Sequence, residues 1–224
     1  LPAFWKGSTL GKEEKQAVAT RLSEYTGIDT PWILEKNLRI REREFAGRLL
    51  QPEGMSISVY DSRVTALGPY TGDDNDQGSF LLAGPLKTAM TAYLSEDLGL
   101  RTDRRYLSGN AEVYLKWNWE SGRVPPVNAD SINTGYPDIS DDFAQALNRC
   151  YFLKVFIGSG LFDLEVPYDS VLYTIRHLDI PEERRGNITM KTYPGGHMFY
   201  ANPEAHRQFG EDLRAFYGRV REGQ

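Results

Sequence analysis

The sequence has only one cysteine and three histidines among its 224 residues, and it has no long apolar run. A single cysteine excludes an intrachain disulfide and any metal site built from several cysteines. No apolar stretch approaches the roughly 20 residues that a membrane-spanning helix requires, so we expect no membrane span. Acidic residues outnumber basic ones by 31 to 26. Nucleic-acid binding needs a basic surface that displaces counterions from phosphates, so we expect no nucleic-acid partner.

The composition that remains is that of an ordinary globular protein, with 40% hydrophobic and 25% charged residues, enough for a sizeable core. The first residues, LPAFW, include no initiator methionine, no basic region and no apolar segment typical of a signal peptide. A processed mature chain and a fragment of a longer protein could both begin in this way. We expect a fragment, because the motifs described below lack one of their members.

Helical patterns dominate the beginning of the sequence. Apolar residues recur at helical spacing over residues 12–25, and a charged helix is predicted over residues 41–50. Between them, Thr30 and Pro31 are typical of a helix start, with Thr30 as the N-cap. Because no strand pattern separates these helices, residues 1–67 are predicted to form a helical insertion or lid.

The middle of the sequence has weaker signals. The acidic stretch GDDNDQG at residues 72–78 lacks the ligand spacing of an EF-hand. It therefore predicts a solvated loop in preference to a metal site. A helix is expected over residues 85–98, and an irregular connection over residues 106–137.

The last third has the clearest pattern, in which helices and strands alternate. Helices are predicted over residues 141–148, 169–178 and 203–217, and strands over residues 153–158 and 188–193. This alternation is typical of a parallel sheet covered by helices on both faces. We therefore expect residues 68–224 to form part of an α/β domain, with a ligand site beyond the carboxyl ends of the strands.

An aspartate and a histidine follow the two predicted strands. Asp163 lies in the loop after the first strand, and His197 lies in the loop after the second, behind Gly195 and Gly196. Taken singly, such an aspartate is usually a turn or helix-cap residue, and a lone histidine is usually a surface residue. Neighbouring parallel strands lie about 4.8 Å apart, so their loops meet at one edge of the sheet. An aspartate that holds one nitrogen of the imidazole leaves the other free to act as a general base toward a serine.

A nucleophile to complete a triad is absent from the sequence. No serine occupies a G-x-S-x-G motif, and the nearest stretch, GMSIS at residues 54–58, ends in serine and lacks a preceding strand. Cys150 precedes a strand where a nucleophile would follow one, and it is expected to be a buried core thiol.

The motifs GSGLFDLEVP at residues 158–167 and YPGGHMFY at residues 193–200 resemble the C-terminal half of the serine carboxypeptidase family, of the bacterial type. Residues 21–40 resemble that family's helical insertion, and residues 61–63 resemble the segment that closes it. The resemblance implies an α/β-hydrolase fold that cleaves C-terminal residues from peptides. Asp163 and His197 would be two triad members, and Met198 would help to form the pocket for the leaving residue. The serine and the oxyanion-hole donors would belong to the N-terminal half.

These inferences combine into one expectation. The chain is predicted to be the C-terminal half of an α/β-hydrolase sheet with a preceding helical lid segment, without cofactor or metal and inactive by itself. Its partners would be a peptide substrate and the N-terminal half or chain that carries the serine. The absence of disulfides favours a bacterial source, and the family favours a periplasmic or secreted location. An esterase or acyltransferase on the same fold, and a non-catalytic chain that binds a partner, remain alternatives.

Overall fold

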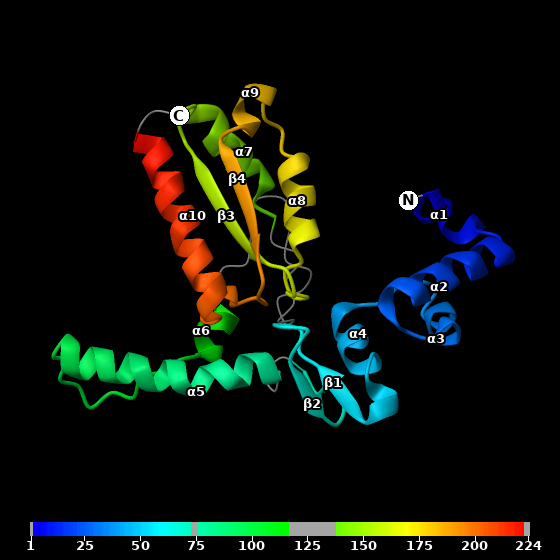
Figure 1. The fold of residues 1–224 in the computed structure, drawn as a ribbon, viewed down its shortest axis with the longest axis horizontal. Helices are drawn as coiled ribbons and strands as arrows, with labels where there is room; N and C mark the ends of the chain where they lie inside the picture. The colour runs from blue at the N-terminus through cyan, green and yellow to red at the C-terminus, as the bar shows by residue number, and fades with distance from the viewer. Residues whose placement is uncertain (1, 73–75, 117–137, 222–224) are drawn as a thin grey trace. The chain divides into compact units, whose positions relative to one another are not determined.

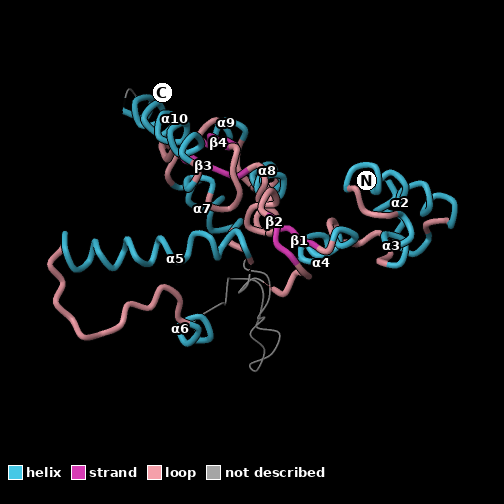
Figure 2. The backbone as a smooth tube through the Cα atoms, turned by 60° about the horizontal axis from the view of Figure 1, so that its bottom comes forward, coloured by secondary structure: helices cyan, strands magenta, loops and turns pink. Residues whose placement is uncertain are grey.

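A computed structural model describes residues 2–72, 76–116 and 138–221. Its helices are α1 (Pro2–Lys6), α2 (Lys12–Thr26), α3 (Thr30–Glu35), α4 (Glu42–Arg48), α5 (Gln77–Ala92), α6 (Ala111–Lys116), α7 (Ser140–Arg149), α8 (Tyr168–Arg176), α9 (Glu182–Arg185) and α10 (Pro203–Arg221). Its strands are β1 (Met55–Ile57), β2 (Thr65–Leu67), β3 (Val155–Gly160) and β4 (Ile188–Tyr193). The chain is therefore of mixed α/β character, with many helices and short strands (Figures 1 and 2). Among the described helices, none is both long enough and apolar enough to cross a membrane.

The chain forms two compact units. One consists of Leu1–Leu82, Gly160–Pro167 and Pro194–Ala205, and the other consists of Ala83–Ser159, Tyr168–Tyr193 and His206–Gln224. Residues 1–67, the predicted lid, therefore belong to the first unit together with the loops that follow β3 and β4.

The second unit contains a two-stranded sheet of β3 and β4. The two strands are parallel, because residue numbers increase in the same direction in both segments from one hydrogen-bonded pair, Val155–Asn187, to the next, Phe162–Gly195. Helices cover both faces, since successive side chains of a strand point to opposite sides. Val155 packs in the core formed with α7, whereas the ring of Phe156 lies 5.5 Å from that of Phe216 on α10.

The first unit has two small cores. In one, Ala19 of α2 and Ile33 of α3 are buried together with Ile28. In the other, Ala46 of α4 is buried against residues of β1 and the segment that follows it. Strand β1 pairs with β2 in antiparallel register, with Ser56 opposite Ala66.

Three predicted elements need correction. Asp29, not Thr30, is the N-cap of α3, because its carboxylate accepts a hydrogen bond from the Trp32 N–H. Helix α5 begins at Gln77 and runs through Pro85, where the sequence pattern had placed its start. Part of the predicted irregular connection is helical, in α6, and residues 117–137 lie outside the described part of the chain.

Of the predicted solvated loop at residues 72–78, residues 73–75 lie outside the described part of the chain. Asp76 is not solvated, because it is only 2% exposed. Its Oδ1 accepts hydrogen bonds from the Ser58 hydroxyl at 2.5 Å and from the Gly78 and Ser79 N–H groups at 3.0 and 3.2 Å. Its Oδ2 accepts from the Val59 N–H at 2.8 Å. Asp76 thus caps α5 and anchors the end of β1 at the same time, which explains why the helix starts before Pro85.

Replacing Asp76 with alanine is expected to lower the free energy of unfolding by roughly 3 kcal/mol, because four donors would lose a buried charged acceptor. Urea unfolding followed by circular dichroism measures this loss. Asp29→Ala is the matched control, since Asp29 caps α3 from an exposed position, and it should cost clearly less. Equal losses for the two variants would contradict the anchoring role of Asp76.

Candidate functional site

Asp163 and His197 lie in the loops that follow β3 and β4, and both loops belong to the first unit. Oδ2 of Asp163 lies 3.0 Å from Nδ1 of His197. The short distance that the sequence predicts between these two side chains is therefore confirmed. Because an ionised carboxylate can only accept, Nδ1 carries the proton and Nε2 keeps its lone pair.

The carboxylate of Asp163 is fixed in place. Its side chain is only 5% exposed, and its Oδ1 accepts hydrogen bonds from the N–H groups of Glu165 and Val166, both at 2.9 Å. One oxygen is thus held by the backbone while the other faces the imidazole. The aspartate has the turn-forming role that its loop position suggests, and it retains a second oxygen for His197.

His197 is held on its backbone and left accessible at its ring. Its N–H donates to the Tyr60 carbonyl at 2.6 Å, and its ring meets the Tyr60 ring edge-on with centroids 5.4 Å apart. The side chain remains 38% exposed. Within the described ranges, no group forms a hydrogen bond with Nε2. This nitrogen can therefore accept a proton from a group that approaches from outside.

Two glycines make this close packing possible. A Cβ on Gly196 would lie only 2.5 Å from Cβ of Asp61 and would also collide with the Tyr60 carbonyl. A Cβ on Gly160 would lie 2.7 Å from the Gly195 carbonyl oxygen. Real Cβ atoms are not found this close to a backbone oxygen, so glycine is needed both at Gly160, the last residue of β3, and at Gly196 in the loop that carries His197.

The environment of His197 stabilises its protonated form. The hydrogen bond to Asp163 raises the pKa of His197 above its ordinary value, burial opposes this rise, and the charges of Asp163 and Glu165 add to it. Because the pKa is higher in the folded chain than in the unfolded one, the pair contributes stability that is fully present below about pH 6.5. That contribution is lost as the pH rises through the folded-state pKa.

Asp163→Asn is expected to lower the pKa of His197 toward its ordinary value and to remove this pH-dependent stability. An NMR titration of ¹⁵N-labelled histidine measures the first effect, and the dependence of the unfolding midpoint on pH measures the second. His206→Ala, a change at an exposed position on α10, is the control for the unfolding measurements. An unchanged His197 titration in the variant would show that the pair does not form in solution.

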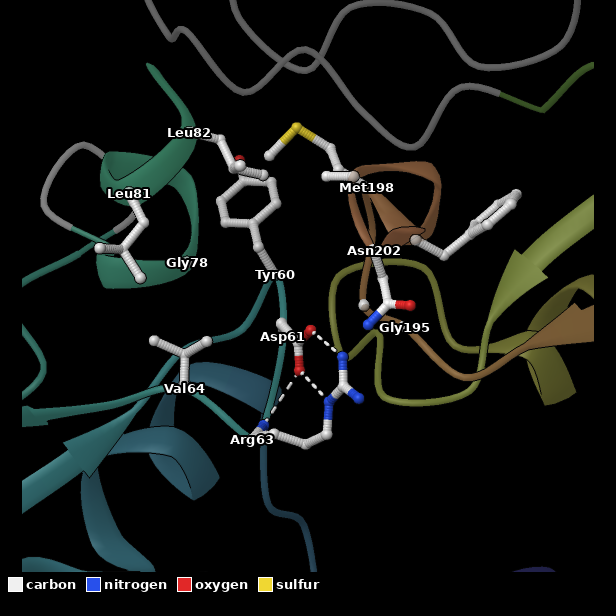
Figure 3. Close-up of a pocket in the computed structure, with 13 residues that line it drawn as sticks. Tyr60, Asp61, Arg63, Val64, Gly78, Leu81, Leu82, Gly195, Met198 and Asn202 are labelled. Carbon is white, nitrogen blue, oxygen red and sulfur yellow. Dashed lines mark hydrogen bonds and ion pairs between the residues drawn. The ribbon is translucent and has the colours of Figure 1, made fainter. Parts of the chain in front are cut away.

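A cavity of about 210 Å³ lies beside this pair in the first unit (Figure 3). Its lining includes Met198, next to His197 in sequence, and Tyr60, whose ring contacts the imidazole. Leu81 and Leu82 add apolar surface, and Arg63 adds a charged group that is ion-paired with Asp61. The structure thus places Met198 in a mostly apolar cavity, which is compatible with the pocket role that the resemblance implies.

The other candidates from the sequence have different surroundings. Cys150 is exposed, not buried as predicted, because it lies at the C-cap where the chain leaves α7. Ser56 is 4% exposed within β1, and the hydroxyl of Ser58 donates to Asp76. In the described part of the chain, no three histidine, cysteine or acidic side chains are grouped in a way that could hold a metal ion.

Sequence reasoning missed the role of Tyr60, whose carbonyl and ring both contact His197. The sequence singled out residues 61–63, but only through the family resemblance. The only nearby signal is the run at residues 56–59, which is buried in the structure and directly precedes Tyr60. This run does not indicate which distant loop Tyr60 contacts. Comparison of the whole chain with protein-family models, with curated proteins and with solved structures found no match.

Proposed function

We propose that this chain supplies the base and the orienting carboxylate of a serine carboxypeptidase-like hydrolase. The observation that carries the proposal is the hydrogen bond of 3.0 Å between Nδ1 of His197 and Oδ2 of Asp163. The other oxygen of Asp163 is occupied by two backbone N–H groups. This combination fixes the tautomer in which Nε2 is the basic atom.

In this proposal His197 acts first as a base and then as an acid. Nε2 takes the proton from a serine hydroxyl as the oxygen attacks the scissile carbonyl of a peptide, and it then gives the proton to the leaving amine. A water molecule then attacks the acyl-enzyme, with Nε2 again acting first as base and then as acid, and the serine is released. Asp163 holds the ring and stabilises the imidazolium, and its charge is consistent with the raised pKa of His197.

The serine is expected from chain outside these 224 residues, because none of the serines here occupies a nucleophile motif. The cavity beside Met198 would receive the leaving residue of the peptide. Its volume of about 210 Å³ and its leucine and methionine lining suit an apolar side chain of moderate size.

The reaction class can be tested with the full-length protein, by which we mean residues 1–224 together with the chain that is expected to carry the serine. Blocked dipeptides, the same dipeptides as C-terminal amides, and simple aryl esters should be compared as substrates. A carboxypeptidase cleaves the first group and strongly prefers the free carboxylate. Hydrolysis of the esters alone would assign the site to an esterase, and no turnover of any substrate would contradict the proposal.

A further inference from the structure

One short segment contacts both loops that carry the Asp163–His197 pair. On the side of His197, the Tyr60 carbonyl accepts the His197 N–H at 2.6 Å. On the side of Asp163, the Ser62 N–H donates to the Phe162 carbonyl at 3.0 Å. These two contacts lie within residues 60–63, so this segment connects the two loops independently of the sheet.

Arg63 repeats this connection with a single side chain. Its guanidinium lies over the ring of Phe162, with 4.5 Å from Cζ to the ring centroid. Its Nη1 also reaches the carbonyl of Pro194 at 3.4 Å. Phe162 directly precedes Asp163, and Pro194 begins the turn that leads to His197. One planar cation therefore contacts the residue before Asp163 and the start of the turn that leads to His197.

Asp61 holds this guanidinium in a fixed plane. Nε of Arg63 donates to Oδ1 of Asp61 at 2.9 Å, and Nη2 donates to Oδ2 at 2.7 Å (Figure 3). Burial alone would raise the pKa of Asp61, but the hydrogen bonds from Arg63 outweigh it and lower the pKa. A two-point pair of this kind sets orientation as well as attraction, which a lysine could not reproduce.

The segment has little freedom to shift. The Val59 N–H is held by the buried carboxylate of Asp76 at 2.8 Å, and the Leu164 N–H donates to the Val59 carbonyl at 3.0 Å. Gly196 is in such close contact with Tyr60 and Asp61 that a Cβ would not fit. A displacement of residues 60–63 would therefore be transmitted to the loops that carry Asp163 and His197.

We propose that Arg63, oriented by Asp61, is a positioning residue that keeps the imidazole of His197 aligned with the carboxylate of Asp163. This inference rests on the proposed function and extends it to a residue outside the triad. Without the guanidinium, the Pro194 turn and the Phe162 side chain lose their common contact. The imidazole then samples orientations in which Nδ1 does not point at Asp163, and Nε2 is misplaced relative to the substrate.

Arg63→Met tests the inference, because methionine keeps an apolar side chain over Phe162 and removes the fork of donors. Arg48→Met is a matched control. Arg48 is also paired with an aspartate, Asp29, and also lies over an aromatic ring, that of Trp32 at 5.6 Å. Both variants should be compared in the 224-residue chain by urea unfolding and by titration of ¹⁵N-labelled histidine. Kinetics are measured in the full-length protein.

For Arg63→Met we expect the pKa of His197 to fall toward its ordinary value. We also expect kcat to fall by about 100-fold with little change in KM, because a misplacement near 1 Å is enough for such a loss. Arg63→Lys, which keeps the charge and is the milder change if Arg63→Met folds poorly, should give an intermediate kcat. Arg48→Met should leave the His197 titration and kcat at parental values.

The inference is overturned if Arg63→Met leaves both the His197 titration and kcat unchanged while Asp163→Asn lowers both. The proposed function then stands without a role for Arg63. It is equally overturned if Arg63→Met and Arg48→Met lower kcat by the same factor, since the effect would then be one of general stability. If His197→Ala retains full activity, the proposed function fails instead, and the imidazole titration still decides whether Arg63 positions the ring.

Discussion

Replacing His197 with alanine in the full-length protein is expected to lower kcat for a blocked dipeptide by roughly 10⁵- to 10⁶-fold. The base would be lost, and the serine would have to attack as a neutral hydroxyl. Asp163→Asn is expected to cost about 10⁴-fold, because an amide N–H facing Nδ1 favours the tautomer with the proton on Nε2. Steady-state kinetics with a single substrate measure both losses. The double variant should be little worse than His197→Ala, since the two residues act as one unit.

The control for these variants is His206→Ala. His206 is exposed on α10, and its removal should leave kcat near the parental value. The circular dichroism spectrum should be similar for all variants, because the His197 side chain is 38% exposed and contributes little to a core. The unfolding midpoints of His197→Ala and Asp163→Asn should fall only by the contribution of the Asp163–His197 pair. A folded His197→Ala protein with parental turnover would show that another residue is the base.

The sequence predicted the features that depend on short-range order. Strand β4 has the predicted bounds, Ile188–Tyr193, and α10 begins at the predicted Pro203. In these segments alternation, helical spacing and proline placement act within a few residues. The approach of Asp163 to His197 could also be predicted, because parallel neighbouring strands place the loops that follow them at one edge of the sheet.

The contacts that complete the site could not be predicted, because they join residues far apart in the sequence. Nothing near Tyr60 indicates that its carbonyl receives the His197 N–H, and nothing near Arg63 indicates that it reaches Pro194. The burial of Asp76 was hidden for the same reason, since its partners Ser58 and Val59 lie 18 and 17 residues earlier in the sequence. An acidic stretch predicts a solvated loop unless hydrogen-bond donors from elsewhere in the chain satisfy its carboxylates. Only the tertiary structure shows that such donors reach Asp76.

The resemblance and the local pattern also gave different kinds of information about the site. The pattern placed Asp163 and His197 together, whereas the resemblance alone suggested a role for Met198 and for residues 61–63. The structure places Met198 and Arg63 along the same cavity, next to Tyr60. The contributions of Met198 and Arg63 to this cavity can be tested residue by residue.

The second large effect concerns where the nucleophile lies. A fluorophosphonate probe labels an activated serine, whose oxygen attacks phosphorus as its proton passes to the base and fluoride leaves. We expect no labelling of the 224-residue chain by itself and stoichiometric labelling of the full-length protein, at a serine outside residues 1–224. Intact mass and peptide mapping measure both results. His197→Ala in the full-length protein should abolish the labelling, which excludes nonspecific reaction with surface hydroxyls.

The environment of Ser56 in β1 and of Ser58 directly after it supports this expectation. Ser56 and Ser58 are 4% and 2% exposed, and the hydroxyl of Ser58 already donates to the carboxylate of Asp76. A nucleophile must instead reach both the probe and the exposed imidazole of His197. Without such a nucleophile, the Asp163–His197 pair can deprotonate only water, and no acyl-enzyme can form. Labelling of Ser56 or of any other serine within residues 1–224 would contradict the proposed division of the triad and would place the nucleophile in this chain.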